Sequence, residues 1–84
     1  QYTNNIDLVD VMTMNPAIEL SENQRVRYKI RHQPGFNLGN LKLTENGLTI
    51  ISDEAISGVA AGQFGVVYSP DAKLCLGSGV IIED

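Results

Sequence analysis

A strict alternation of basic and apolar side chains constrains the fold of this chain more than any other feature of its sequence. The segment reads Arg25-Val26-Arg27-Tyr28-Lys29-Ile30-Arg31. Successive side chains of a β-strand point to opposite faces, so one face would carry Val, Tyr and Ile. The other face would carry four cations spaced about 6.6 Å apart, which is two residues of strand rise. The alternation therefore predicts a strand over residues 24–32 with its apolar face in a core.

This row of four cations, called the cation row below, consists of Arg25, Arg27, Lys29 and Arg31. It allows two interpretations. One is a solvated strand face, or an edge strand whose charges prevent edge-to-edge aggregation. The other is a phosphate-binding stripe, because neighbouring like charges repel one another and an anionic partner would compensate for that cost. Phosphates along a nucleic-acid strand are spaced on a similar scale, but the pattern itself does not identify the anion.

Turn-forming residues divide the rest of the chain into short apolar segments. The turn signals are Asn15-Pro16, Gln33-Pro34-Gly35, Glu45-Asn46-Gly47 and Ser69-Pro70-Asp71-Ala72. Residues 55–62 are open to two interpretations, a single helical turn or an extended connector. The expected strands cover residues 5–13, 24–32, 38–44, 48–51, 63–68 and 73–82. Six short strands without a long helix predict an all-β fold, a small closed or partly open six-stranded β-barrel that forms a single domain over residues 1–84.

The apolar phase of these strands predicts the core. The residues that share this phase are Val26, Tyr28, Ile30, Leu41, Leu43, Ile50, Phe64, Val66 and Tyr68. In the last strand, Gly77 and Gly79 interrupt an otherwise apolar run. Glycine weakens a strand unless the geometry requires it, so we expect a β-bulge, a positive φ or a close backbone approach at one of the two.

Composition narrows the possible classes of protein. The 84 residues are 43% hydrophobic and 19% charged, which argues against a disordered chain. The longest apolar run, Val80 to Ile82, is far too short to span a bilayer, and we expect no signal peptide and no membrane partner. The net charge of -4 argues against a general nucleic-acid binder. Because the chain begins with Gln1, we expect it to be processed or part of something longer.

The sequence predicts no catalytic residue, no cofactor and no metal site. Cys75 and His32 are the only residues of their kinds, so neither an internal disulfide nor a zinc site is expected, and a single cysteine fits the cytoplasm. We interpret Cys75 as a small buried hydrophobe and His32 as a half-buried strand end. Asp53-Glu54 and Glu83-Asp84 are pairs of adjacent carboxylates. Adjacent residues of a strand point to opposite faces, so we expect neither pair to act as a general acid and base. Gly77-Ser78-Gly79 lacks the third glycine and the helix of a dinucleotide-binding loop.

Three segments near the end of the chain follow one another in a recognisable order. They are Ala60-Ala61-Gly62-Gln63, Val66-Val67-Tyr68 and Cys75-Leu76-Gly77-Ser78-Gly79-Val80-Ile81. The order resembles the C-terminal end of bacterial tRNA-specific 2-thiouridylases (the MnmA family, formerly named as methyltransferases). That family ends in a pattern like A-V-T-P-G-Q-x-A-V-F-Y, a turn, and C-L-G-G-G-I-I. The basic strand and residues 5–11 are also similar to segments of the same domain. Ala61 and Ser78 depart from the family's proline and glycine.

The resemblance implies an activity that these residues do not themselves carry. The family enzyme thiolates the wobble uridine of certain tRNAs, using ATP to adenylate the base and a cysteine persulfide to deliver sulfur. The resemblance assigns that work to an N-terminal domain with an S-G-G-x-D-S loop and two catalytic cysteines, neither of which Cys75 matches. It implies that the present chain is the C-terminal barrel, similar to the second domain of translation elongation factors, which helps to hold the tRNA.

We therefore predict that the chain is the non-catalytic C-terminal fragment of a larger cytoplasmic enzyme, and that its cation row contacts tRNA. Its expected partners are tRNA and the catalytic and central domains of the same parent chain. The parent would also use ATP and a sulfur-donor protein. The alternative is a purely structural module that packs against those other domains, in which case the cations would pair with acidic residues there.

Overall fold

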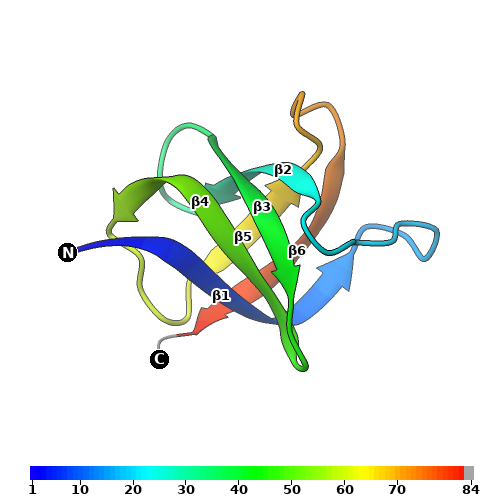
Figure 1. Cartoon of the computed structure of the whole chain (residues 1–84), viewed down its shortest axis with the longest axis horizontal. Helices are drawn as coiled ribbons and strands as arrows, with labels where there is room; N and C mark the ends of the chain where they lie inside the picture. The colour runs from blue at the N-terminus through cyan, green and yellow to red at the C-terminus, as the bar shows by residue number, and fades with distance from the viewer. Residues whose placement is uncertain (83–84) are drawn as a thin grey trace.

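Six antiparallel strands form a closed barrel in the computed structural model, which describes residues 1–82 (Figure 1). The strands are β1 (Tyr2–Thr13), β2 (Arg25–Ile30), β3 (Asn37–Leu43), β4 (Gly47–Ser57), β5 (Phe64–Tyr68) and β6 (Cys75–Ile82). Their order around the barrel is β1-β4-β3-β2-β5-β6, and β6 pairs with β1 to close it. Closure leaves no unpaired sheet edge. The prediction of a small six-stranded β-barrel is confirmed, in its closed form.

The strand β4 is longer than the sequence indicated. It continues through the polar residues 52–54, which lie beyond the strand expected over residues 48–51, and ends at Ser57. Pairing explains this extension, because Ser52 lies opposite Gly39 of β3 and Ser57 lies opposite Tyr2 of β1. Of the two interpretations left open for residues 55–62, the extended one is correct for the part that β4 includes.

Ten buried side chains fill the barrel, and Tyr28 is the largest of them. Its hydroxyl donates a hydrogen bond of 2.7 Å to Oγ of Ser52, which is also buried. Among the described residues, every buried polar side-chain atom has a hydrogen-bond partner. The core comprises Ile6, Leu8, Val26, Tyr28, Ile30, Leu41, Leu48, Ile50, Val67 and Ile81. The chain thus supplies a complete core from its own residues.

Four of the nine predicted core residues lie outside this core. Leu43 and Phe64 are each 44% exposed, and Val66 and Tyr68 are only partly buried. The phase predicted for β5 is therefore wrong, because Gly65 and Val67 are its inward residues. A Cβ at Gly65 would lie 3.0 Å from Cδ2 of Leu8. Leu8 already fills the interior at this level, so the inward position accepts only a small residue and the larger side chains of β5 point outward.

The two glycines of β6 lie beside irregularities in the pairing. Between Val67 and Tyr68 the partner changes from Gly77 to Cys75, and between Val9 and Met12 it changes from Val80 to Ser78. A Cβ at Gly77 would lie 2.5 Å from the carbonyl oxygen of Met12. The predicted bulge and close approach are thus present. Neither glycine has a positive φ. In β1 and β6 the residue with a positive φ is Asp10, at 52°.

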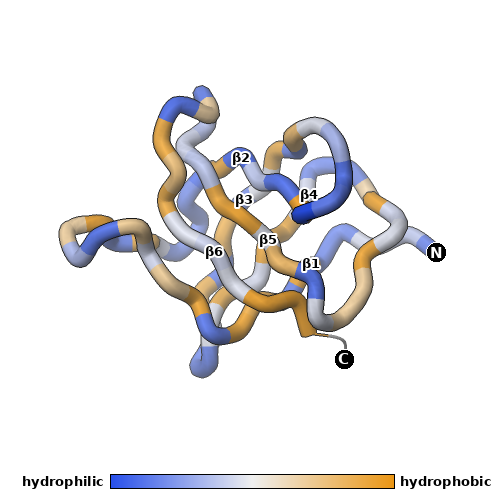
Figure 2. Tube along the Cα trace, turned by 180° about the vertical axis from the view of Figure 1, so that it is seen from behind, coloured by the Kyte–Doolittle hydropathy of each residue, from blue (hydrophilic) through white to orange (hydrophobic). Residues whose placement is uncertain are grey.

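Figure 2 views the barrel from behind, where β5 and β6 run side by side and carry apolar or neutral residues along most of their length. Since the inward positions of these strands include three glycines, much of this apolar character faces outward. The outer surface of the barrel is therefore less polar than the alternation on β2 alone would indicate.

Candidate nucleic-acid interface

The strand β2 presents Arg25, Arg27 and Lys29 on the outside of the barrel, and Arg31, the last member of the cation row, directly follows the strand. Val26, Tyr28 and Ile30 are buried, and the basic residues between them are exposed or partly exposed. The strand pairs with β3 on one side and with β5 on the other. Because β2 is not an edge strand, the interpretation of its charges as protection against edge-to-edge aggregation is wrong. A solvated face and an anion-binding face both remain compatible with this placement.

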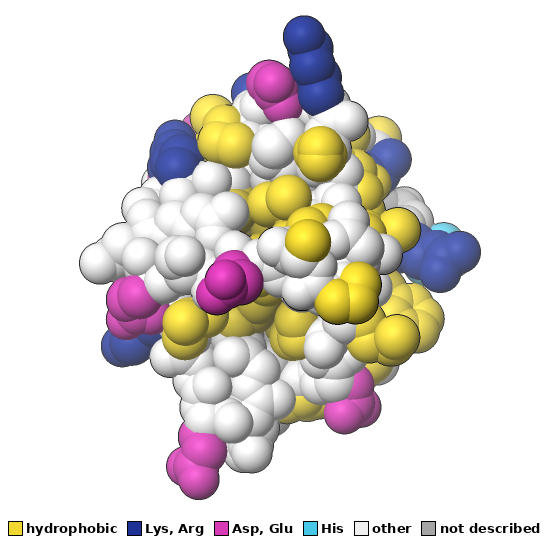
Figure 3. Space-filling model, turned by 90° about the vertical axis from the view of Figure 1, so that its right-hand side faces the viewer, with side chains coloured by type: hydrophobic (Ala, Val, Ile, Leu, Met, Phe, Trp, Pro, Cys, Tyr) yellow, Lys and Arg dark blue, Asp and Glu magenta, His cyan; other side chains and the backbone are white. Residues whose placement is uncertain are grey.

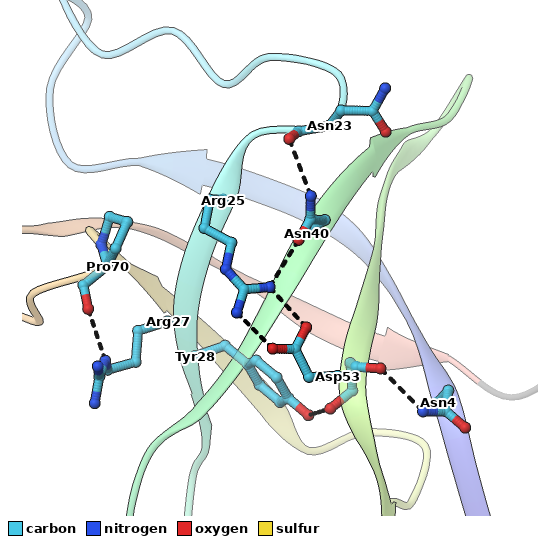
Figure 4. Close-up of polar contacts among 9 residues, drawn as sticks. Asn4, Asn23, Arg25, Arg27, Tyr28, Asn40, Asp53 and Pro70 are labelled. Carbon is cyan, nitrogen blue, oxygen red and sulfur yellow. Dashed lines mark hydrogen bonds and ion pairs between the residues drawn. The ribbon is translucent and has the colours of Figure 1, made fainter.

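Arg25, at one end of the cation row, is paired within the protein (Figure 4). Its Nη1 donates to Oδ1 of Asp53 at 2.6 Å and to Oδ1 of Asn40 at 2.9 Å. The hydrogen bond to Asp53 raises the pKa of Arg25, and the same bond lowers the pKa of the Asp53 carboxyl. Within residues 1–82 this is the only ion pair. Much of the charge of Arg25 is therefore already compensated.

Arg27 contacts the turn between β5 and β6. Its Nε donates to the carbonyl oxygen of Pro70 at 2.8 Å, as Figure 4 shows. Asp71 follows in the same turn, and its pKa is lowered chiefly by the hydrogen bond from the Ser69 hydroxyl, with a smaller contribution from the charge of Arg27. Arg27 is thus held by a neutral acceptor and lies near one carboxylate.

Lys29 and Arg31 have aromatic neighbours instead. The Lys29 ammonium lies 5.8 Å from the centroid of the Phe36 ring, and the Arg31 guanidinium lies 5.8 Å from that of Phe64. Phe36 in turn meets Tyr68 edge to face, with the ring centroids 5.0 Å apart. No carboxylate of the described residues forms an ion pair with either cation. The cation row therefore divides into a half that donates hydrogen bonds to the barrel, Arg25 and Arg27, and a half with aromatic neighbours, Lys29 and Arg31.

A groove adjoins this second half of the row. Its lining residues are Lys29, Arg31, His32, Gln33, Pro34, Val66 and Tyr68. Lys29 comes from β2, the residues from Arg31 to Pro34 come from the loop that follows it, and Val66 and Tyr68 come from β5. No acidic side chain lines the groove, and Lys29 and Arg31 can both donate hydrogen bonds to an anion there.

A second surface is apolar and lies where β1 ends and β6 begins. Met12, Met14 and Leu74 are 72%, 61% and 50% exposed, and the backbone N–H of Met14 donates to the carbonyl oxygen of Leu76. Figure 3 shows this side of the molecule, with hydrophobic side chains gathered in the middle and charged ones mainly towards the rim. We call Met12, Met14 and Leu74 the apolar end of the barrel.

Other residues considered in the sequence do not form a reactive site among the described residues. Cys75 was expected to be buried and is partly buried. His32 was expected to be a half-buried strand end, but it is exposed and lies in a turn with a φ of 79°. No group of His, Cys, Asp and Glu within residues 1–82 could hold a metal ion. Glu83 and Asp84 lie outside the described residues. Residues 1–82 contain no helix that is long and apolar enough to span a membrane.

Sequence reasoning placed the cations correctly on one face but missed the aromatic residues beside them. Phe64 and Tyr68 were assigned to the core, and Phe36 was assigned no role. The inward glycine at position 65 is the signal that distinguishes the two phases of β5, because a glycine between large apolar residues marks a position where something else fills the space.

Comparisons with known proteins agree with the resemblance found in the sequence. The family model described as aminomethyltransferase beta-barrel domain matches residues 4–81. The tRNA-specific 2-thiouridylase MnmA of Parabacteroides distasonis is 39% identical over 80 residues, which cover 95% of this chain and 22% of that protein. MnmA 2 of Bacteroides fragilis is 44% identical over 70 residues, or 83% of this chain and 20% of that protein.

The MnmA protein of Porphyromonas gingivalis is 48% identical over 56 residues, which cover 67% of this chain and 16% of that protein. The chain thus spans about a fifth of the length of the curated relatives it matches. No solved structure matches, so the likeness to an elongation-factor domain stays a prediction.

Proposed function

Since this chain belongs to the aminomethyltransferase β-barrel domain family, we propose that it is the C-terminal, tRNA-contacting domain of a tRNA-modifying enzyme. The enzyme would carry out the ATP-dependent 2-thiolation of wobble uridine, in line with the 2-thiouridylase names of the relatives. We assign ATP binding, adenylation and sulfur transfer to the catalytic and central domains of the parent chain, served by a sulfur-donor protein. The parent would work in the cytoplasm. The barrel itself would hold the tRNA and have no catalytic residue, cofactor or metal.

One observation carries this proposal: Lys29, on the outside of β2, and Arg31, just after that strand ends, line one groove and form no ion pair with a carboxylate of the described residues. Two uncompensated cations on one face are suited to phosphates, which position a nucleic acid without selecting its sequence. Arg25 and Arg27 extend the same face. Both arginines already donate hydrogen bonds within the barrel, Arg25 to Asp53 and Arg27 to Pro70. We therefore expect each arginine to contribute less to RNA binding than Lys29 or Arg31.

The test is the salt dependence of tRNA binding by the parent-length protein. Each neutralised phosphate contributes about 0.7–0.9 to the slope of log affinity against log salt concentration. The double substitution Lys29→Ala/Arg31→Ala should therefore lower the slope by about 1.5 and weaken binding to all tRNAs alike. Lys42→Ala/Lys73→Ala is the matched control, because it removes two exposed cations that lie outside the cation row. An equal effect of both pairs, or no effect of either, would contradict contact at the row.

The alternative function, packing against other domains of the parent, is favoured by the apolar end of the barrel. Met12, Met14 and Leu74 expose apolar side chains where β1 ends and β6 begins, and about four-fifths of each relative lies outside the match. The two functions use different faces and can coexist. Met12→Ser/Met14→Ser should lower the thermal stability of the parent-length protein while leaving the salt slope unchanged. A lower salt slope in this variant would assign the apolar end to RNA contact.

A further inference from the structure

We propose that the groove beside Lys29 and Arg31 binds an unpaired nucleotide, with phosphate at the two cations and a base against Val66 and Tyr68. This inference rests on the proposed function and deepens it, because it names the form of RNA that the cation row would contact. The strand register places the necessary groups side by side. Lys29 lies opposite Val66, and the backbone N–H of Arg31 donates to the carbonyl oxygen of Phe64 at 2.9 Å.

The distribution of charge in the groove favours an anion. Lys29 and Arg31 both line the groove, and Arg31 directly follows the end of β2 while its N–H still pairs with Phe64 of β5, so two residues of strand rise would separate their backbones by about 6.6 Å. That spacing suits successive phosphates of an extended strand. No carboxylate lines the groove, and the imidazole of His32 lies at its border. A phosphate entering there would meet positive and hydrogen-bonding groups and no charge of its own sign.

The apolar part of the groove favours a base in addition to phosphate. Val66 and Tyr68 point outward from β5, and Pro34 contributes from the opposite loop. A site for phosphate alone would not need this surface. Unstacked bases commonly lie against aromatic side chains, and this contact tolerates different bases because each has a π-face. In a duplex the bases are stacked inside the helix and would not reach Tyr68, so the groove should prefer unpaired RNA.

Contacts within the barrel hold the groove in shape. The Phe36 ring packs edge to face against Tyr68 and fixes one wall. The side-chain amide of Gln33 donates to the carbonyl oxygens of Ser57 and Gly58 at 3.3 and 3.1 Å, which ties the loop after β2 to the end of β4. A site whose walls are already ordered loses less conformational entropy when a ligand binds.

The first experiment is a nuclear magnetic resonance titration of the 84-residue chain, whose closed barrel and complete core support folding by itself. The probes are a short oligouridine strand and an RNA duplex of equal nucleotide content, at low salt. We expect the oligouridine to shift the amide signals of residues 29–34 and 64–68 and to bind more tightly than the duplex. Equal binding of the two probes, or shifts confined to other residues, would overturn the inference.

The second experiment compares Tyr68→Leu with Tyr2→Leu, a control whose ring is 72% exposed elsewhere on the barrel. Tyr68→Leu should weaken oligouridine binding at least about fivefold and leave duplex binding unchanged, because stacking on an aromatic ring is lost. Tyr2→Leu should change neither. If Lys29→Ala/Arg31→Ala weakens tRNA binding while Tyr68→Leu has no effect on oligouridine, the proposed function stands and the nucleotide groove is refuted. If the double substitution leaves tRNA binding unchanged, the proposed function itself fails.

Discussion

The buried hydrogen bond between Tyr28 and Ser52 offers a quantitative test of how this barrel is stabilised. The Tyr28 side chain is fully buried and Ser52 is 4% exposed, so neither hydroxyl can exchange its partner for solvent. The substitution Tyr28→Phe keeps the ring and removes the donor. A buried hydrogen bond contributes about 1 kcal/mol net, and leaving its partner unsatisfied costs somewhat more. We therefore expect Tyr28→Phe to lower the free energy of unfolding by about 1–2 kcal/mol.

A double-mutant cycle separates the hydrogen bond from other effects. Ser52→Ala should cost a similar amount, and the double variant Tyr28→Phe/Ser52→Ala should cost less than the two together by about 1 kcal/mol, because each single variant leaves one hydroxyl without its partner. Tyr28→Ala should cost about 3–5 kcal/mol through the cavity that it creates. A domain of this length has about 4–13 kcal/mol of stability in total, so the alanine variant would lose a large share of it.

The assay is urea denaturation of the chain followed by circular dichroism, since the sequence has no Trp. Each kcal/mol should also appear as a change of about 4–8 °C in the melting temperature. Tyr2→Phe is the control, because its ring is 72% exposed and its hydroxyl has no buried partner. Strict additivity of Tyr28→Phe and Ser52→Ala, or a cost no larger than that of Tyr2→Phe, would show that the buried hydroxyl pair does not stabilise the barrel.

Two further predictions follow from the contacts of β4 and β5. The Arg25 hydrogen bond lowers the pKa of Asp53, so this pair stabilises the fold above the ordinary carboxyl range near pH 4 and the contribution is lost as the pH falls below it. Melting temperatures of wild type and Asp53→Asn should therefore differ at neutral pH and converge in acid; a constant difference would count against the pair. In β5, Val67→Asp should unfold the barrel whereas Phe64→Ser should leave it folded, as circular dichroism would report, and the reverse result would restore the phase predicted from the sequence.

The sequence specified β2 well and β5 poorly, and the difference has a physical cause. In β2 each inward residue is apolar and each outward residue is charged, so a shift by one position would bury cations. In β5 both phases are apolar, and the aromatic residues Phe64 and Tyr68 favoured the wrong one. Only the interior of the folded barrel decides between them, since Leu8 from β1 occupies the space beside Gly65.

The candidate site was predictable in its cations and not in their surroundings. Parity along one strand placed all four basic residues on one face. Apart from Phe36 in the loop after β2, their partners come from β3, β4, β5 and the turn after β5, which meet the cation row through the order of strands around the barrel. Asp53 lies beyond the strand expected over residues 48–51, but β4 continues through it and brings its carboxylate to Arg25. The division of the cation row into two halves therefore required the three-dimensional structure.

The same strand order also determines from which side an RNA can approach. Apart from the cation row, Lys42 and Lys73 are the only Lys or Arg of residues 1–82, against eight acidic residues, of which Asp53 is paired with Arg25. The remaining faces therefore repel phosphate, and the repulsion acts within a Debye length of about 8 Å at physiological salt. A polyanion would be favoured only where β2 and β5 lie together, and there it meets the outward side chains of β5 as well as the cations. The net negative charge, which argues against general nucleic-acid binding, would thus orient a weak and local contact, with overall affinity supplied by the other domains that we propose for the parent.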